Sequence, residues 1–478
     1  MGGISGLLET ARRALLAQQF GISVTGHNIA NANTTGYSRQ RANLVATDPA
    51  RTNYGMLGTG VTVASVSRMR NTFVEQQIRT SNGSYEAASA EYNILGQVES
   101  IFNEPSDSAM SGVLNDFFAA WGELATDPGS SVTRNALQLQ AQSMVDNFHR
   151  LYSDASTLRT SLRDELSAKV DRINTLSAEI SDLNVDIVAA EAGGFSAADM
   201  RDLRGAKIEE MSQLANVTVH EDEMGASLIS VGGSMIVGRG THLNLKVVAG
   251  TAATVSGTTF DQLSIVSDYG DTKVNLTGGE AGGLLKSYNT SIPETLGRLN
   301  QLAGAIISGV NALHSAGYGR QSPPMTGVNF FMGTDASSIA IDLTDPALAP
   351  GSSPSIDNIA ASGSATATGD NSVALAIAAA IDKRPLTSGG TTLLGGLSIS
   401  EYYNQTVTNI GSGINGANTV MQSQGLVISN LTEQQDAVSG VSLDEEMTDM
   451  IKFQRAFEAA ARVISTVDEM YTTLISMV

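Results

Sequence analysis

Cysteine is absent from the 478-residue chain, and tryptophan occurs once, at Trp121. A chain without cysteine forms no disulfide bond, has no thiolate nucleophile and offers no thiolate ligand to zinc. Aromatic residues are scarce as well, at 5% of the sequence. Alanine, serine, threonine, asparagine and glycine are abundant instead, and this mixture is typical of long helices that pack through small side chains.

Positive charge is also in short supply, with 28 lysines and arginines against 48 acidic residues and a net charge of -20. Nucleic-acid binding needs clustered basic residues, and acidic surfaces resist anionic membranes. No stretch approaches about 18 uncharged apolar residues. The sequence therefore predicts no nucleic-acid partner and no membrane insertion. Because Arg12 and Arg13 interrupt the first helical segment, it also predicts no cleaved signal peptide.

Motifs that carry catalytic chemistry are missing or incomplete. Gly411–Gly416 fits G-x-G-x-x-G literally, but the residues before it look helical rather than like a buried strand. Gly278–Ser287 resembles a phosphate loop, yet Lys286 comes too late to follow the last glycine directly. The histidines are scattered without metal-ligand spacing, at His27, His149, His220, His242 and His314. We therefore expect no catalytic residue, no cofactor, no metal and no enzyme activity.

Apolar residues at steps of three and four predict long helices near the N-terminus and in the middle of the chain. The first thirty positions carry one such stripe, and the Asn- and Gly-rich segment Asn28–Gly36 then ends it. The same spacing continues from Val132 to Val188, which would make a single rod roughly 80 Å long at about 1.5 Å per residue. Short β-like runs separated by glycine and acidic turns follow in residues 216–282.

This alternation predicts an α+β fold, in which both chain termini build a long-helix, coiled-coil-like shaft and a small all-β domain is inserted in the middle. The predicted parts are an N-terminal assembly helix with its loop, a first shaft segment, the β domain, a returning helix, an irregular Gly/Ser/Pro-rich insertion with one short helix near 372–382, a further shaft segment and a C-terminal assembly helix. In that order they span residues 1–60, 61–215, 216–282, 283–319, 320–397, 398–440 and 441–478.

The C-terminal segment has the strongest helical pattern. Ser442 and Glu445 have the spacing of a capping box, and two adjacent apolar stripes follow them. Two stripes are more apolar surface than one helix partner covers, so the pattern favours burial in a multi-helix assembly, although an ordinary core helix is an alternative. Residues 1–45 carry a balance of +3 and residues 441–478 a balance of -4, which fits terminal segments that lie against each other or against neighbouring subunits.

Both ends together resemble the flagellar axial proteins, the family of rod, hook and hook-associated subunits. The N-terminal resemblance lies in Thr25–Gln40, read as TGHNIANANTTGYSRQ, where an Asn-Ile-Ala-Asn core precedes Asn-Thr and a Gly-aromatic pair. The C-terminal resemblance lies in Gly440–Met447, Phe453–Phe457 and Asp468–Met470. The ending Tyr-Ser-Arg-Gln is similar to the hook-associated branch, whereas rod and hook proteins more often continue with Gly-Phe-Lys.

The resemblance implies a structural subunit at the hook–filament junction, outside the cell, which adapts the hook to the filament and permits filament growth. It implies export through the flagellar type III system without a cleaved signal, and self-assembly in a ring. The implied partners are the hook protein (FlgE), the second junction protein (FlgL) and an export chaperone (FlgN). Terminal helices of this family are typically disordered in the monomer and pair as coiled coils in the inner layer of the tube.

The motifs then nominate the residues of the assembly interface. These are Leu7, Leu8, Leu15, Ile22, Ile29, Asn28, Asn31, Asn33 and Tyr37 at one end, and Met447, Met450, Phe457, Ile464, Met470, Tyr471 and Leu474 at the other. Three alternatives stay open: another axial protein such as a hook or distal rod subunit, a secreted hydrolase that uses the same export route, and an adhesin whose β domain binds a host ligand.

Overall fold

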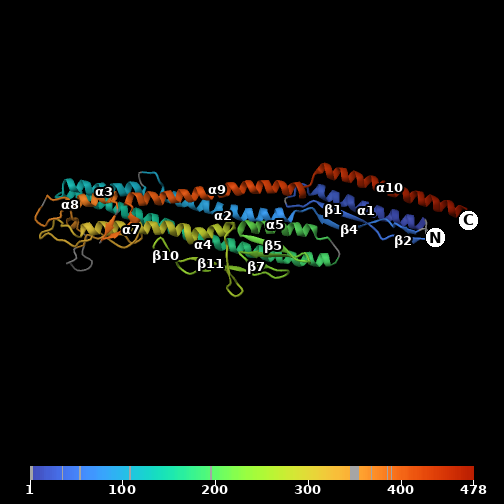
Figure 1. Cartoon of the computed structure of the whole chain (residues 1–478), viewed down its shortest axis with the longest axis horizontal. Coiled ribbons are helices and arrows are strands. Elements are labelled where there is room, and N and C mark those ends of the chain that lie inside the picture. The colour runs from blue at the N-terminus through green and yellow to red at the C-terminus, as the bar shows by residue number, and fades with distance from the viewer. Residues whose placement is uncertain are drawn as a thin grey trace.

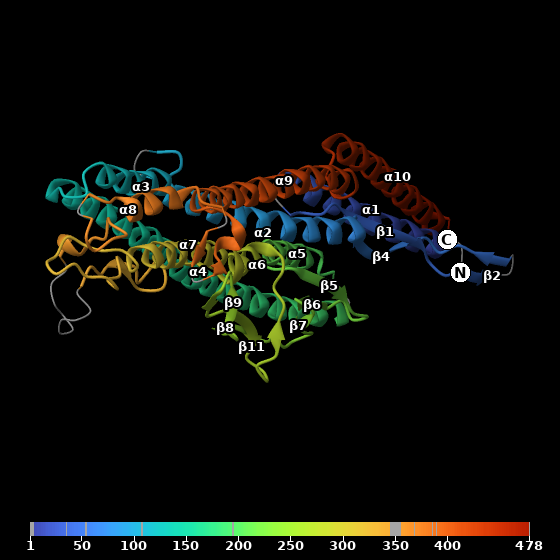
Figure 2. The same cartoon turned by 60° about the vertical axis from the view of Figure 1, so that its left-hand side comes forward.

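The computed structural model is an elongated molecule built mainly of long helices (Figure 1). It describes residues 4–34, 36–52, 55–106, 109–193, 196–344, 355–367, 369–384, 386–388 and 390–477, so Thr35 of the N-terminal motif lies outside the described residues. The two chain ends lie together at one tip, and α3, α8 and the loops around them form the opposite tip. A β-rich region covers one side of the middle (Figure 2).

The helices follow the predicted three-four spacing. Their bounds are α1 Ile4–Ala30, α2 Thr72–Phe102, α3 Met110–Thr126, α4 Ser131–Ala192, α5 Ala198–Leu214, α6 Gly279–Lys286, α7 Ile292–His314, α8 Ser372–Ala378, α9 Ile399–Ser439 and α10 Leu443–Ser476. A π-helical turn, Ser287–Ser291, joins α6 to α7, and short 3-10 turns occupy Ile356–Asn358, Ala379–Ile381 and Leu394–Gly396. The helical part of the predicted fold class is confirmed.

Helix α4 is the longest of these, with 62 residues and a length of about 93 Å. It starts where the Ser130 hydroxyl accepts hydrogen bonds from the N–H groups of Val132 and Thr133, and Gly193 caps its end. Its predicted apolar stripe is buried from Leu151 to Ile187, except at Leu158 and Leu183, which are half-buried. We call α2–α7 and α9 the shaft, because these helices run together along the long axis (Figure 1).

The middle of the chain contains the predicted strands, and the β part of the fold class is confirmed. Antiparallel strands β5 Val217–Glu221, β6 Ser227–Val231 and β7 Ser234–Val237 form one sheet, and β8 Leu245–Ala249, β11 Leu263–Ser267 and β12 Lys273–Val274 form a second. Sequence reasoning missed the hairpin of β9 Ala253–Val255 and β10 Thr258–Phe260, because each strand has only three residues. Two short antiparallel pairs lie towards the tip formed by α3 and α8, which we call the distal tip. They are β13 Phe331–Met332 with β14 Ala340–Ile341, and β15 Thr387–Ser388 with β16 Thr391–Thr392.

One hydrophobic core runs through the shaft and the β region together. It includes Leu166 of α4, Ile229 of β6 and Ile265 of β11, which are all fully buried. At the distal end Phe117, Trp121 and neighbouring rings pack edge to face. Within the described residues this core begins at Ile94 and ends at Ile410. The terminal helices α1 and α10 therefore contribute nothing to it.

The terminal helices form a separate unit with the β strands that follow α1. Strand β1 Gln40–Ala46 pairs with β4 Val61–Arg68, and β2 Ala50–Thr52 pairs with β3 Gly55–Leu57 beyond them. We call α1, β1–β4 and α10 the terminal module. Because β4 pairs with β1, a domain border at residue 60 would divide this ladder, and we propose that the module ends near Arg70 instead.

The predicted capping box at the start of α10 is wrong in its side-chain part. Ser442 is the N-cap residue, but its side chain makes no capping hydrogen bond. Glu445 pairs with Arg39 instead. A complete capping box occurs at α9, where Ser398 and Glu401 satisfy each other's backbone N–H groups.

Candidate assembly surface and joint of the terminal module

Helix α10 runs antiparallel along α1, which brings both chain ends to one tip (Figure 1). The α10 face turned towards α1 repeats every seven residues, at Glu446, Phe453, Ala460 and Val467, where each side chain is buried or half-buried. The Phe453 ring lies on Gly21, where an added Cβ would come within 2.9 Å of the ring carbons. A sustained seven-residue period is the signature of a coiled-coil seam.

The structure distributes the predicted interface residues over three environments. The exposed ones are Leu7, Leu8, Asn33, Met447, Phe457, Met470, Tyr471 and Leu474. The half-buried ones are Leu15, Ile22, Ile29, Asn31, Tyr37, Met450 and Ile464. Asn28 is buried inside the chain.

A long apolar strip of α10 is left uncovered in the single chain. Its most exposed members lie near the C-terminus, where Leu474 is 49%, Ile475 74% and Met477 78% exposed. On α1, Leu7 and Leu16 are 46% and 55% exposed. Contiguous exposed apolar surface of this kind marks an interaction site in soluble proteins.

Asn28 connects three segments that are distant in sequence. Its amide Nδ2 donates to the Gln40 carbonyl oxygen and to Oε2 of Glu446, both at 2.9 Å. Its Oδ1 accepts from the Gln40 backbone N–H at 3.0 Å and from the Tyr37 hydroxyl at 2.7 Å. All of its hydrogen-bonding capacity is thus used inside the chain, at the end of α1.

Tyr37 is held as a neutral donor. Burial, together with the carboxylates of Asp199 and Asp202, raises the pKa of its hydroxyl. The hydroxyl donates to Asn28, so His27 Nδ1, 3.0 Å away, contacts it as a donor in the tautomer protonated at Nδ1. The loop after α1 is thereby folded back onto the helix end.

Arg39 connects this loop to the start of α10. Its Nε donates to Oε1 of Glu446 and its Nη1 to Oε2 of Glu445, both at 2.6 Å. Burial disfavours the charged guanidinium, but the two carboxylates outweigh this effect and raise the pKa of Arg39. The backbone N–H of Arg39 also donates to the Ser439 carbonyl oxygen at 3.0 Å. The opposite charges of the two ends meet here, as their local balances suggested.

The residues on either side of Arg39 bind helix α5 of the shaft. Asp202 accepts hydrogen bonds from the Ser38 backbone N–H and hydroxyl, both at 2.9 Å. Its Oδ1 also accepts from Arg68 Nη1 at 2.8 Å. Gln40 Nε2 donates to Oδ1 of Asp199 at 2.7 Å. This joint between module and shaft is therefore polar, in contrast to the apolar core.

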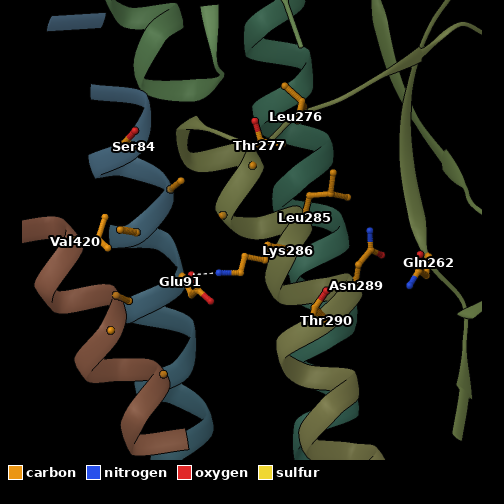
Figure 3. A pocket seen from close by; sticks show the side chains of 17 residues that line it. Ser84, Glu91, Gln262, Leu276, Thr277, Leu285, Lys286, Asn289, Thr290 and Val420 are labelled. Carbon is orange, nitrogen blue, oxygen red and sulfur yellow. Dashed lines mark hydrogen bonds and ion pairs between the residues drawn. The ribbon is translucent and has the colours of Figure 1, made fainter. Parts of the chain in front are cut away.

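The two glycine-rich stretches meet in a groove on the shaft (Figure 3). The groove has a volume of about 870 Å³ between α2, α6 and α9. Gly413 and Gly416 line it from the middle of α9, so the G-x-G-x-x-G match is part of a helix and not a dinucleotide loop. Lys286 Nζ lies 2.7 Å from Glu91 Oε2. The carboxylate thus balances the positive charge that a bound phosphate would need.

The described residues include no candidate metal site and no candidate membrane-spanning helix. Among those residues no group of three or more histidine, aspartate or glutamate side chains could hold a metal ion. No helix in the described part of the chain is long and apolar enough to span a bilayer.

Comparison with known proteins agrees with the motifs at both ends and extends through the middle. The family model of the flagellar hook-associated protein FlgK helical domain matches residues 95–331. The family model of the flagella basal body rod protein matches residues 8–37. The family model of the flagellar basal body rod FlgEFG protein C-terminal region matches residues 434–477. The chain is 30% identical to flagellar hook-associated protein 1 of Bacillus subtilis (strain 168) over 510 residues, which covers 98% of this chain and 97% of that protein. The chain belongs to the FlgK family of flagellar hook-associated proteins.

Other FlgK proteins are more distant in sequence. Flagellar hook-associated protein 1 of Escherichia coli (strain K12) is 24% identical over 558 residues, covering 99% of this chain and all of that protein. The solved structure of the flagellar hook junction protein FlgK from Burkholderia pseudomallei aligns with a TM-score of 0.58 at 16% identity, over 76% of this chain and 100% of that chain. The likeness to the solved Burkholderia structure supports the α+β fold alone.

Membership of the FlgK family makes the chain a structural component of the flagellum and associates it with the flagellar axial structure. The predicted family resemblance and the predicted structural, non-enzymatic role are therefore confirmed.

Sequence reasoning did not nominate the residues that join the loop after α1 to α10 and to the shaft. Arg39, Gln40, Glu445 and Glu446 stood inside the quoted motifs, and the charge contrast between the ends was a signal for their pairing. Phe453 could have been found from the seven-residue period of α10, but that period gives no information about Gly21, which lies on α1. Asp199 and Asp202 are part of an ordinary acidic helix face in sequence, and no local pattern distinguishes them.

Proposed function

We propose that this FlgK-family chain is a junction subunit that adapts the hook to the filament and permits filament growth. The observation that carries the proposal is the uncovered apolar strip of α10, which lies on a terminal module outside the hydrophobic core. Burial of such a strip stabilises an assembly by roughly 25 cal/mol per Å² of apolar surface. A ring of identical subunits, paired through α1 and α10, would cover it.

The neighbours in this proposal are the hook protein (FlgE) on one side and the second junction protein (FlgL) on the other. The structural relative from Burkholderia pseudomallei is a flagellar hook junction protein, which supports this position. Before assembly, the exposed end of α10 would bind the export chaperone (FlgN). The proposal also includes export through the flagellar type III channel without a cleaved signal. A chain without cysteine forms no disulfide bonds, so it is compatible with passage in an unfolded state.

The first test is electron microscopy of a strain that lacks this gene, with an immunoblot of the medium for flagellin. Bare hooks with unassembled flagellin in the medium would support the junction role. Intact filaments would contradict it and would favour the adhesin or hydrolase alternatives.

Complementation then tests the apolar strip itself. Leu474→Asp would place a charge on the exposed strip and should leave hooks bare, whereas Thr473→Asp adds the same charge to the neighbouring exposed position and should restore filaments. Ile464→Asp, at a half-buried position, should also block incorporation while the β region stays folded. Normal filaments with Leu474→Asp would show that this strip is not the assembly surface.

A further inference from the structure

We propose that a set of asparagines on the shaft acts as substitute strand residues, which fix the register in which the β strands dock on the helices. The proposal concerns only the shaft and the strands packed on it, so it depends neither on the junction role nor on the order of the terminal helices. Each asparagine binds both backbone groups of the residue that begins a strand. The pairs are Asn174 with Leu245 of β8, Asn184 with Ser227 of β6, Asn289 with Leu263 of β11, and Asn311 with Phe331 of β13. We call these side chains the register asparagines.

The register asparagines repeat one pattern of two hydrogen bonds. Asn174 Nδ2 donates to the Leu245 carbonyl oxygen at 2.9 Å, and Asn174 Oδ1 accepts from the Leu245 N–H at 2.7 Å. Between Asn289 and Leu263 the corresponding distances are 2.9 and 2.8 Å. A side-chain amide has a carbonyl oxygen and an NH₂ group, so it offers a strand residue the same acceptor and donor as a neighbouring strand would.

The other two sites follow the same pattern. Asn184 Nδ2 donates to the Ser227 carbonyl oxygen at 2.8 Å, and its Oδ1 accepts from the Ser227 N–H at 2.9 Å. Its second Nδ2 hydrogen bond, at 2.9 Å, goes to the carbonyl oxygen of Gly238, directly after β7. Asn311 donates to the Phe331 carbonyl oxygen at 2.7 Å and accepts from the Phe331 N–H at 3.0 Å.

The strand starts bound in this way are the places where a ladder is incomplete. In the described part of the chain, each of them has a neighbouring strand on one side only. β8 is an edge strand, with β11 beside Leu245. β12 joins β11 at Ile265, after Leu263, and β7 joins β6 at Ile229, after Ser227. The asparagine thus occupies the open side of the strand, where the backbone groups would otherwise lack a partner strand.

Recognition of a strand through its backbone specifies a position rather than a side-chain type. If the strand slid by one residue, the next N–H and C=O would point to the opposite side, and both hydrogen bonds would be lost. Asn184 is fully buried, so its amide would then be left without partners at a cost in free energy. Asn174 and Asn184 both belong to α4, and they hold strands of the two different sheets. One helix therefore sets the spacing between these sheets.

The test is amide hydrogen exchange on the purified full-length chain, measured by mass spectrometry with residue-level fragmentation. The decisive amide is Val248 of β8, which lies opposite Ser264 of β11. Gly250 donates to β11, and the direction alternates along a strand, so the Val248 N–H faces β11 and not Asn174. Asn174→Leu keeps the approximate size of the side chain but removes both hydrogen bonds to Leu245. Exchange at Val248 should then be about tenfold faster, since each lost hydrogen bond contributes a factor of several.

Two further variants separate docking of one strand from a general loss of stability. Asn135→Leu makes the same substitution at an exposed position of α4 and should leave exchange at Val248 unchanged. Asn311→Leu should speed exchange in β13 and β14 while β8 keeps its protection. If Asn174→Leu fails to fold, Asn174→Gln decides, because it keeps the amide but displaces it by one methylene, and it should also speed exchange at Val248.

Two outcomes would overturn the proposal. Faster exchange at Leu245 alone, with Val248 still protected, would mean that Asn174 makes a local hydrogen bond without holding the strand. Equal acceleration of β8 and β13 in both Asn174→Leu and Asn311→Leu would show that these side chains stabilise the whole shaft rather than the register of one strand each.

Discussion

Arg39 Nε lies 2.6 Å from Oε1 of Glu446, although 407 positions separate the two residues. The Glu446 side chain is 3% exposed and the Arg39 side chain 23%. Asn28 donates to the other Glu446 oxygen, Oε2, at 2.9 Å. Asn28 and Arg39 of the N-terminal motif and Glu446 of the C-terminal motif therefore form one contact between the two ends of the chain.

Arg39→Gln should weaken the attachment of α10. Glu446 would keep only the Asn28 amide, and a buried carboxylate that loses its cation costs about 3 kcal/mol. We expect faster amide hydrogen exchange in the first turns of α10. Arg41→Gln is the matched control, since Arg41 is an exposed neighbour on β1. Exchange rates in Arg39→Gln equal to those of the control would show that the pair does not hold the helix.

Gly21→Val should separate α1 from α10. Its Cβ would lie 2.9 Å from Phe453 ring carbons, and overpacking of this kind costs about 1–3 kcal/mol. Trypsin should then cleave faster after Lys452 and Arg455. Gly26→Val is the control, because an added Cβ there meets nothing within 4 Å. Equal cleavage of both variants would mean that close packing at Gly21 is dispensable.

Acid should destabilise the distal end of the shaft through His314. Burial lowers its pKa from 6.5 to about 4, and its ring binds the Val328 carbonyl oxygen and the Ala360 N–H. As the pH falls, His314 is protonated in the unfolded chain before it is protonated in the folded chain. The contribution of the neutral His314 to the unfolding free energy is therefore complete above pH 6.5 and is lost as the pH falls towards 4. Between pH 7 and 4.5 the loss is about 2–3 kcal/mol, at about 1.36 kcal/mol per pKa unit.

Urea unfolding of His314→Gln at both pH values checks this prediction. The variant should lose less unfolding free energy between pH 7 and 4.5 than the parent chain. His220→Gln, at an exposed position of β5, should behave like the parent. Parallel losses in all three proteins would exclude His314 as the titrating group.

The two helix starts at Ser398 and Ser442 should respond differently to alanine. Ser398→Ala removes a capping box whose hydroxyl accepts the Glu401 N–H, and should lower the unfolding free energy by about 1 kcal/mol. Ser442→Ala removes no side-chain capping bond and should change stability little. Chemical denaturation of both variants measures the difference. A larger loss at Ser442 would indicate that its hydroxyl caps α10 in solution.

Much of the fold was predictable because it follows from local periodicity. The stripe from Leu151 to Ile187 indicates a buried helix face whatever surrounds it, since a period of 3.6 residues places those side chains on one side. Hairpin β9–β10 was not predictable in this way, because strands of three residues contain too few alternations. The capping box at Ser442 failed for another reason: the Glu445 side chain pairs with Arg39, which is far away in sequence.

The sequence alone determined the long helices, the central β region, the terminal motifs and their family, because each depends on residues that are neighbours in the chain. Only the tertiary structure decided which motif residues face inwards. It buried Asn28 and paired Arg39 with Glu446. It also selected Asp202 from an ordinary acidic helix as the anchor of the module. Contacts between distant positions depend on how whole helices are placed, and no local spacing encodes that placement.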